Sequence, residues 1–283
     1  MNIIRNIQEM KECSLELRFR RETIGFVPTM GYLHRGHLEL VRRALAENDA
    51  TVVSIFVNPA QFGPSEDFDT YPRDEDRDLQ LLKELGVDCV FIPSERVIYP
   101  EGYSTYVHVE RLTDYLCGAK RPGHFKGVAT VVTKLFNIIS PDRAYFGQKD
   151  AQQFRVLRRM VLDLNMNVEM VEIPTVREED GLAMSSRNRY MSNSERREAL
   201  LIREALDKGL EMIREGTHSV SGIRDELGRI LRKGKHVFVD YIEIVDEKNL
   251  SPVERLDNDV ILAIAVFVGK TRLIDNEIIR VRE

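Results

Sequence analysis

The sequence is poor in cysteine and has no long apolar run. Its three cysteines, Cys13, Cys89 and Cys117, are widely spaced and odd in number, which argues against a disulfide framework or a zinc site and favours a reducing compartment. The longest uninterrupted apolar run, residues 260–268, is far shorter than the roughly 20 residues of a membrane-spanning helix. The first residues lack the apolar core of a secretion signal. We therefore expect a soluble, cytoplasmic protein without membrane segments.

An excess of basic charge is also absent. Lysine and arginine together number 41, aspartate and glutamate 46, and the formal net charge is −5. This balance argues against nucleic acid as a partner, because such proteins usually carry a basic surplus. Hydrophobic residues make up 43% of the 283 residues, which is enough for a substantial core. At roughly 150 residues per domain, this length predicts about two domains or one large one.

The first 175 residues alternate between strand-like and helix-like segments. We expect strands over 23–28, 50–57, 87–92, 144–146 and 168–173, and helices over 36–46, 74–85, 125–139 and 150–164. Short strands that are apolar on both faces and separated by helices indicate a parallel sheet covered on both sides. The predicted fold class is therefore α/β, with a doubly wound, Rossmann-like domain over residues 1–175. Ligands of such sheets bind at the carboxyl ends of the strands.

The pattern changes in the last third of the chain. Helices are expected over 194–215 and 220–231, followed by strands over 237–245 and 260–268. A short strand pair, 271–274 and 277–281, is expected to be joined by a turn at Asp275 and Asn276. Helices followed by strands predict a small α+β domain, which we expect over residues 176–283 as a lid on the first domain.

The richest motif joins the first expected strand to the first expected helix. It reads Pro28-Thr29-Met30-Gly31-Tyr32-Leu33-His34-Arg35-Gly36-His37. The amino terminus of a helix attracts phosphate through its free N–H groups and its dipole. His34 and His37 are three residues apart and so lie on one side of a helix. Two such donors suit a triphosphate whose charge rises during displacement at the α-phosphorus. The alternatives are two capping or surface histidines, or a zinc pair without a nearby third ligand.

Two later segments carry cations that also suit phosphate. In Phe146-Gly147-Gln148-Lys149-Asp150, the lysine can meet phosphate and the aspartate can cap a helix or bind a ribose hydroxyl. In Met184-Ser185-Ser186-Arg187-Asn188, an arginine fork and two hydroxyls can clamp phosphate oxygens. Taken singly, the first segment is better explained as a turn with an aspartate cap, and the second is equally consistent with a polar interdomain loop. Their occurrence together favours a nucleotide site between the two domains.

These motifs resemble those of known enzymes. His-x-Gly-His with a later Met-Ser-Ser-Arg resembles the class I nucleotidyltransferase superfamily. The blocks at 27–31, 56–62, 121–125, 145–150 and 184–189 resemble, in the same order, those of the pantothenate synthetase family, with Ala60 where that family more often has threonine or methionine. The resemblance implies that ATP adenylates the carboxylate of (R)-pantoate with loss of pyrophosphate, and that β-alanine then displaces AMP to give pantothenate. It also implies a need for Mg²⁺, whose protein ligands stay unassigned, and a homodimer.

The resemblance also implies roles for individual residues. The expected ATP-binding residues are Met30, Gly31, Tyr32, Leu33, His34, Arg35, Gly36, His37, Gly147, Gln148, Lys149, Asp150, Val176, Met184, Ser185, Ser186 and Arg187. Of these, His37, His34, Lys149 and Arg187 are the expected catalytic residues, with His37 acting as an acid or hydrogen-bond donor to the leaving phosphate. Val176 is expected to contact adenine through its backbone.

Two glutamines are expected to bind the second substrate. The resemblance assigns Gln61 and Gln153 to pantoate, and Gln61 also to β-alanine. A glutamine amide both donates and accepts, so it can recognise the hydroxyls of pantoate without adding a charge that would trap its carboxylate. A lone glutamine is ordinarily a solvated side chain, and only the surrounding motif favours the binding role.

Several questions stay open at this point. The acidic segment 66–78 is either a mobile solvated loop or a lid that excludes water and offers carboxylates to Mg²⁺, with Asp78 as a weak metal candidate. His124 and Lys126 have no assigned role. Rival functions are transfer of a nucleotide to a phosphate ester, which the glutamine blocks disfavour, and nucleotide sensing without turnover, which the intact cation set disfavours.

Overall fold

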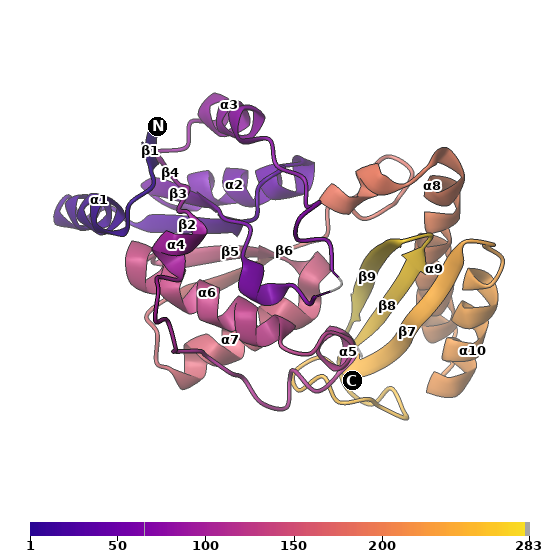
Figure 1. Ribbon diagram of the computed structural model, residues 1–283. Coiled ribbons are helices and arrows are strands. Elements are labelled where there is room, and N and C mark those ends of the chain that lie inside the picture. Colours follow the sequence, from indigo (N-terminus) through magenta and orange to yellow (C-terminus); the bar gives the residue numbers. More distant parts are fainter. Residues whose placement is uncertain (65, 281–283) are drawn as a thin grey trace.

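The computed structural model describes residues 1–64 and 66–280, which form two sheets (Figure 1). The larger sheet is parallel, with strand order β1-β4-β3-β2-β5-β6. Its strands are β1 (Asn2–Ile4), β2 (Ile24–Thr29), β3 (Ala50–Ile55), β4 (Cys89–Phe91), β5 (Arg143–Gly147) and β6 (Glu169–Ile173). The smaller sheet is antiparallel and contains β7 (Val237–Asp246), β8 (Val260–Val268) and β9 (Thr271–Ile279). The predicted fold class, α/β with a second α+β domain, is confirmed.

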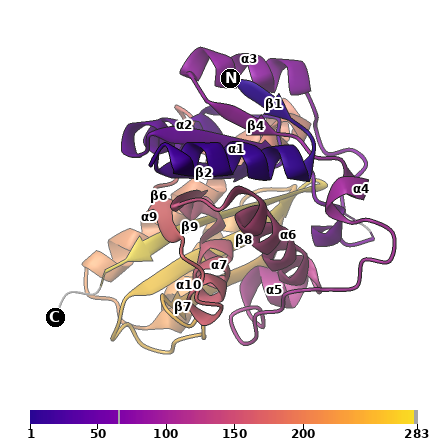
Figure 2. The ribbon, with the colours of Figure 1, turned by 90° about the vertical axis from the view of Figure 1, so that its left-hand side faces the viewer.

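Helices cover both faces of the parallel sheet. The helices α2 (Arg35–Glu47) and α3 (Glu75–Leu85) pack on one face, and α1 (Ile7–Phe19), α6 (His124–Ile139) and α7 (Ala151–Asp163) pack on the other (Figure 2). Successive residues of a strand point to opposite faces. Accordingly Phe26 belongs to the core under α6, whereas the next residue, Val27, belongs to the core under α2.

The strand order brings the chain segments that follow β2 and β5 together at one edge of the parallel sheet. The strand β2 pairs with both β3 and β5, so the chain runs outward in one direction through β3 and β4 and in the other through β5 and β6. A crevice forms at the carboxyl edge where the strand order reverses in this way. The segments that follow β2 and β5 are the two predicted phosphate-binding motifs.

The smaller sheet packs on both its faces. One face carries α8 (Asn193–Ala199), α9 (Leu201–Arg214) and α10 (Val220–Leu231). Along β8, Leu262 and Ile264 belong to the core under these helices, whereas Ile261 and Ala263 belong to the core of the first domain. The two domains therefore share a continuous apolar contact across the face of this sheet.

Short helices complete the structure. These are α4 (Glu95–Ile98), α5 (Leu116–Lys120) and the 3₁₀ turns η1 (Pro59–Gln61), η2 (Gln148–Asp150) and η3 (Ser186–Tyr190). Within residues 1–64 and 66–280, none of the helices has the length and apolar character needed to cross a bilayer.

The predicted hairpin turn at Asp275 and Asn276 is wrong. Both residues lie inside the continuous strand β9, where they pair with Ile264 and Ala263 of β8. The turn between these strands is at Gly269 and Lys270, and Gly269 has a positive φ of 58°. The two adjacent polar residues suggested a turn, because the local sequence does not show the distant residues that they bind in the folded chain. The end of the predicted last strand, residue 281, lies outside the described residues.

Other differences concern boundaries. The expected helix over 194–215 is divided at Leu200 into α8 and α9, although the backbone of Leu200 stays helical. The expected strand over 87–92 is reduced to β4. The elements β1, α1, α4 and α5 were not predicted, because their apolar residues are too few or too scattered to form a clear periodic pattern.

Candidate active site

A cavity of about 240 Å³ opens at the carboxyl ends of β2 and β5. Most of the sequence-predicted residues line it, namely Met30, His34, Gly36, His37, Gln61, Gly147, Lys149, Asp150, Gln153, Val176, Met184, Ser185, Ser186 and Arg187. A larger cleft of about 1090 Å³ adjoins it and shares Lys149, Asp150 and Arg187. The structure thus brings together residues from separate chain segments.

Five of the predicted ATP-binding residues do not line this cavity: Gly31, Tyr32, Leu33, Arg35 and Gln148. The Leu33 side chain is fully buried, and Arg35 is exposed. The carbonyl oxygen of Gln148 accepts a hydrogen bond from Asn276. ATP contacts by these five residues stay predictions.

The carboxylate of Asp78 holds the loop before α2. It accepts hydrogen bonds from the backbone N–H groups of Tyr32 and Leu33 at 2.6 and 2.7 Å, and its side chain is only 1% exposed. Burial raises the pKa of this carboxyl. No cluster of three metal-ligating side chains occurs among the described residues. Asp78 therefore anchors the loop before α2, and its weak candidacy as a metal ligand is not supported.

The two motif histidines form the start of α2. His34 is the amino-terminal cap, and its Nδ1 accepts from the N–H of Gly36 at 3.2 Å. The Nδ1 of His37 accepts from the N–H of His34 at 3.3 Å, and the rings stack with centroids 4.0 Å apart. A neutral ring whose Nδ1 accepts carries its proton on Nε2. The backbone therefore fixes both imidazoles as Nε2–H donors.

Both histidines are neutral near pH 7. Burial, reinforced by the charge of Lys149, lowers the pKa of His34 to about 4. Burial, His34 and Lys149 together hold the pKa of His37 well below its ordinary value. The pair can donate hydrogen bonds to phosphate without first binding protons, and bound phosphate would favour the protonated form.

Lys149 and Arg187 approach the cavity from different elements. Lys149 lies on η2, directly after β5, with Nζ 3.6 Å from Asp150. Arg187 lies on η3 and donates from Nε and Nη2 to the two carboxylate oxygens of Asp67, both at 2.8 Å. Ser186 donates to the carbonyl of Tyr32 at 3.3 Å, which connects η3 to the loop before α2.

Gln61 is held in place by its neighbours. Its Oε1 accepts from Asn58 at 3.0 Å, and its Nε2 lies 3.1 Å from the sulfur of Met30. The turn η1 packs closely on α6 at Gly127, where a Cβ would overlap the carbonyl of Ala60. The close approach of the backbones of η1 and α6 therefore fixes Gln61, the residue predicted to bind pantoate.

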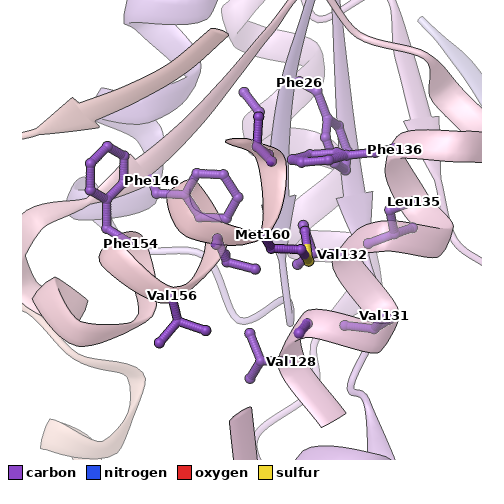
Figure 3. Packing of buried hydrophobic residues seen from close by; sticks show 14 of the residues in the cluster. Phe26, Val128, Val131, Val132, Leu135, Phe136, Phe146, Phe154, Val156 and Met160 are labelled. Atoms are coloured by element: carbon purple, nitrogen blue, oxygen red, sulfur yellow. The ribbon is translucent and has the colours of Figure 1, made fainter. Parts of the chain in front are cut away.

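Gln153 and an apolar wall complete the cavity. The wall comes from α6 and contains Val128, Val131, Val132 and Leu135, which Figure 3 shows grouped on one side of that helix. Their spacing of three or four residues is the sequence signal for one helix face. This part of the cavity suits a branched aliphatic group.

Sequence reasoning missed the roles of three lining residues. His124, which had no assigned role, contacts the carbonyl of Gln61 at 2.8 Å through Nδ1 and Arg121 at 3.1 Å through Nε2. Arg121 in turn pairs with Glu66 at 2.5 Å. The signal was available, because Arg121 and His124 belong to a motif block directly before an apolar helix. The third residue, Tyr71, whose ring centroid lies 5.7 Å from the guanidinium carbon of Arg187, gave no signal in the sequence.

Comparison with known proteins places the chain in a family. The family model for pantoate-beta-alanine ligase matches residues 2–278. The pantothenate synthetase of Thermosipho africanus is 61% identical over 279 residues, covering 99% of this chain and 100% of that protein. That of Thermotoga petrophila is 59% identical over the same length, covering 99% and 100% of the two chains.

Solved structures agree with this result. A pantothenate synthetase from Thermus thermophilus is 48% identical, with a TM-score of 0.93 over 98% of this chain and 99% of that chain. A pantoate-beta-alanine ligase from Francisella tularensis, complexed with beta-gamma ATP and beta-alanine, is 35% identical with a TM-score of 0.79, covering 98% and 97%. The chain is therefore a member of the pantoate-beta-alanine ligase family.

Proposed function

We propose that this protein joins (R)-pantoate to β-alanine at the expense of ATP, through a pantoyl adenylate, and releases pyrophosphate and AMP. The observation that carries the proposal is the convergence of His34, His37, Lys149 and Arg187 around one cavity that Gln61 and Gln153 also line. The family match and the Francisella ligase complexed with beta-gamma ATP and beta-alanine support both the reaction and ATP as substrate.

In the first step, a carboxylate oxygen of pantoate attacks the α-phosphorus of ATP, and the bond to the bridging oxygen of pyrophosphate breaks. Negative charge builds on the leaving group. The Nε2–H donors of His34 and His37 and the cations of Lys149 and Arg187 can offset it. A fixed donor at such a position contributes on the order of 10²–10³ in rate.

Recognition of pantoate falls to neutral and apolar groups. Pantoate carries two hydroxyls, a carboxylate and a carbon with two methyl groups. The amides of Gln61 and Gln153 can pair with the hydroxyls, and the α6 wall can take the methyl groups. An uncharged pocket leaves the carboxylate free to react.

In the second step, the neutral amine of β-alanine attacks the acyl carbon of the adenylate. The new C–N bond forms as the bond from that carbon to the phosphate oxygen breaks, AMP leaves with the electron pair, and the amine loses a proton. No side chain acts as a nucleophile, so positioning of the reacting groups is the main contribution of the protein.

Mg²⁺ is expected to enter with ATP, where it would neutralise charge on the phosphates. Asp150 is the single carboxylate among the described residues that line the cavity, and its side chain is 48% exposed. This fits a cation that takes its other ligands from phosphate and water, as Mg²⁺ commonly does. Asp150 is therefore the residue proposed to face the ion.

The domain limits, assembly and location are proposals of the same kind. We place the boundary between residues 175 and 176, because the parallel sheet ends at Ile173. The first domain would bind nucleotide and pantoate, and the second would act as its lid. A homodimer and a cytoplasmic location are proposed from the family resemblance and the three free cysteines. Light scattering of the purified chain tests the dimer.

The deciding experiment mixes the purified protein with ATP, (R)-pantoate and β-alanine and measures AMP. We expect AMP to form only when all three are present, and pyrophosphate exchange into ATP to require pantoate alone. Exchange that instead requires a phosphate ester would favour a nucleotidyltransferase of that type. ATP binding without exchange or AMP release would favour a nucleotide sensor and overturn the proposal.

A further inference from the structure

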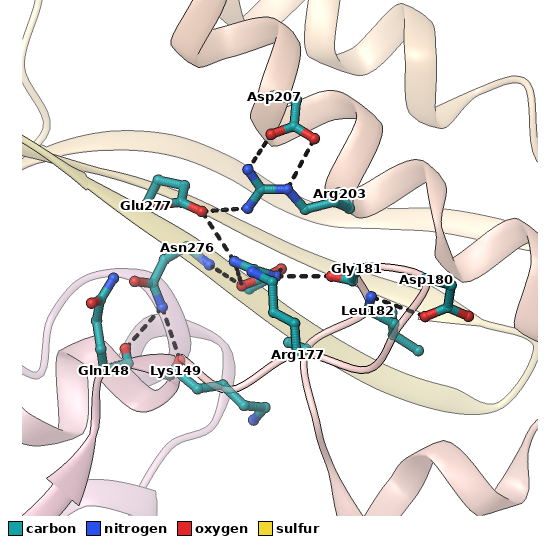
Figure 4. Close-up of polar contacts among 12 residues, drawn as sticks. Gln148, Lys149, Arg177, Asp180, Gly181, Leu182, Arg203, Asp207, Asn276 and Glu277 are labelled. Atoms are coloured by element: carbon teal, nitrogen blue, oxygen red, sulfur yellow. Dashed lines mark hydrogen bonds and ion pairs between the residues drawn. The ribbon is translucent and has the colours of Figure 1, made fainter. Parts of the chain in front are cut away.

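Asn276, a residue of the second domain, contacts the turn that carries Lys149. Its side-chain Nδ2 donates to the carbonyl oxygens of Gln148 and Lys149 at 3.1 and 2.9 Å, and the residue is only 4% exposed (Figure 4). Two adjacent acceptors fix the orientation of the amide, because its oxygen would repel both carbonyls. The two N–H groups of one asparagine thus hold two successive peptide groups of η2.

The position of Asn276 in the sheet is unusual for a polar residue. Side chains alternate between the faces of a strand, so Asn276 shares its face of β9 with Ile274 and Ile278. Both isoleucines pack against the core of the first domain. Burying an amide there is costly, and its Oδ1 has no hydrogen-bond partner among the described residues, so an apolar residue would pack in this row at lower cost. The polar residue is therefore best explained by the carbonyls that it binds.

A partly buried ion network holds the strand segment around Asn276. The neighbouring Asp275 is 3% exposed, accepts from the N–H of Asn276 at 2.8 Å and pairs with Arg177 at 2.6 Å. Arg177 also donates to Glu277 at 3.0 Å, and Glu277 pairs with Arg203 of α9, as Figure 4 shows. The network connects α9, β9 and the segment after β6, so Asn276 is set on a rigid support.

We infer that Asn276 is a positioning residue that acts from the second domain on Lys149. Its two hydrogen bonds fix η2, and η2 sets where the Lys149 side chain meets the triphosphate. The inference rests on the proposed function, because it assigns Lys149 to the phosphates of ATP. It makes the phosphate site dependent on the packing between the two domains.

Asn276→Ala removes both hydrogen bonds and tests this inference. We expect kcat/KM for ATP in pantoate-dependent pyrophosphate exchange to fall at least tenfold, with less than a twofold change in the KM for pantoate. Asn276→Asp has nearly the same shape but no N–H donor, so it should lose at least as much. Val266→Ala is the control, because it opens a cavity in the same sheet at a fully buried residue whose side chain belongs to the core under α8, α9 and α10.

A double-mutant cycle separates positioning from a general loss of stability. If Asn276 acts through Lys149, the tenfold effect of Asn276→Ala should shrink to less than twofold in a Lys149→Ala background. An equal effect in both backgrounds, or an equal loss in Val266→Ala, would overturn the inference. Should Asn276→Ala fail to fold, Asn276→Ser, which keeps one donor, is judged by the same criteria.

A binding measurement distinguishes this inference from the proposed function. Calorimetric titration with ATP and Mg²⁺ alone needs neither pantoate nor β-alanine. A wild-type protein that binds ATP but forms no AMP would refute the proposed reaction, while weaker ATP binding by Asn276→Ala would still support the link to Lys149. Full activity and unchanged ATP binding in the folded variant would refute only the inference.

Discussion

Gln152 and Gln153 are consecutive residues of α7, yet their amides have different surroundings. Gln152 is 6% exposed and donates to the carbonyls of Leu112 and Tyr115 at 2.8 and 2.7 Å, which ties α7 to the segment before α5. Gln153 lines the cavity beside the apolar wall of α6. Because successive helix residues are rotated by about 100°, one amide can serve the fold while the next serves a ligand.

This pair gives a matched test of pantoate recognition. Gln153→Ala should raise the KM for pantoate at least tenfold and change that for ATP less than threefold, because only pantoate loses a hydrogen-bonding partner. Gln152→Ala leaves the carbonyls of Leu112 and Tyr115 without their donor and should lower the free energy of unfolding by about 1–3 kcal/mol. Steady-state kinetics and urea unfolding of both variants provide the measurement. Equal effects of Gln153→Ala on both KM values would contradict the assignment.

The ion pair between Arg187 and Asp67 predicts an effect on ATP affinity. We expect Arg187 to leave the Asp67 carboxylate when it meets phosphate, and an ion pair that is about one quarter exposed is worth about 1 kcal/mol at most. Asp67→Asn should therefore tighten ATP binding roughly two- to fivefold at low salt. The control is Asp69→Asn, which removes the same charge from a residue nearby.

Calorimetry at two salt concentrations provides the measurement. The gain in Asp67→Asn should shrink at high salt, since screening weakens the ion pair that it removes. Weaker ATP binding in Asp67→Asn would mean instead that Asp67 holds Arg187 ready for phosphate. An equal gain in Asp69→Asn would indicate only a change of net charge.

The fold was largely predictable because its signals are local. The strands β2, β3 and β5 and the helices α2, α6 and α7 follow from short apolar runs and helical periodicity. The motif at 28–37 could be placed at the carboxyl end of β2 because the strand and the helix around it were both evident. Asp275 and Asn276 gave the opposite result, because local turn chemistry could not reveal the partners Arg177 and Lys149, which lie about 100 or more residues away.

The same distinction between local signals and distant partners applies to the candidate site. Residues predicted to contact substrate lie in motifs, and most of these predicted residues line the cavity. Residues that support them act through contacts with distant parts of the chain, which no local motif indicates. Examples are Asp78, which holds the loop before α2, and Gly127, which packs against η1. His124 lies between these cases, since its motif was evident and its hydrogen bond to Gln61 was not.

The proposed role of His37 predicts that replacing it slows the chemical step. His37→Ala should lower the rate of adenylate formation at least ~10²-fold with little change in ATP affinity, because its Nε2–H is proposed to act on charge that develops in the transition state. His37 also accepts from the N–H of His34, so its thermal stability should be measured in parallel. His108→Ala, at an exposed histidine, is the control. An unchanged single-turnover rate would contradict the role.

The buried histidines predict how stability depends on pH. Burial, reinforced by the charge of Arg121, lowers the pKa of His124 to about 4, whereas an unfolded histidine titrates near 6.5. Between these values the unfolded chain binds a proton that the folded chain does not, so stability falls as pH falls from 6.5 towards 4. From pH 7 to pH 5 this histidine alone should cost about 2 kcal/mol of unfolding free energy.

His124→Gln isolates this contribution. The variant retains a side-chain N–H that can donate to the Gln61 carbonyl but has no group that titrates in this range. Its unfolding free energy, measured by urea denaturation at pH 7, 6 and 5, should therefore fall by about 2 kcal/mol less than that of the wild type. His34 and His37 stay in both proteins, so their contributions cancel in the comparison. Parallel pH dependence in the two proteins would mean that His124 binds its proton as readily in the folded state as in the unfolded chain.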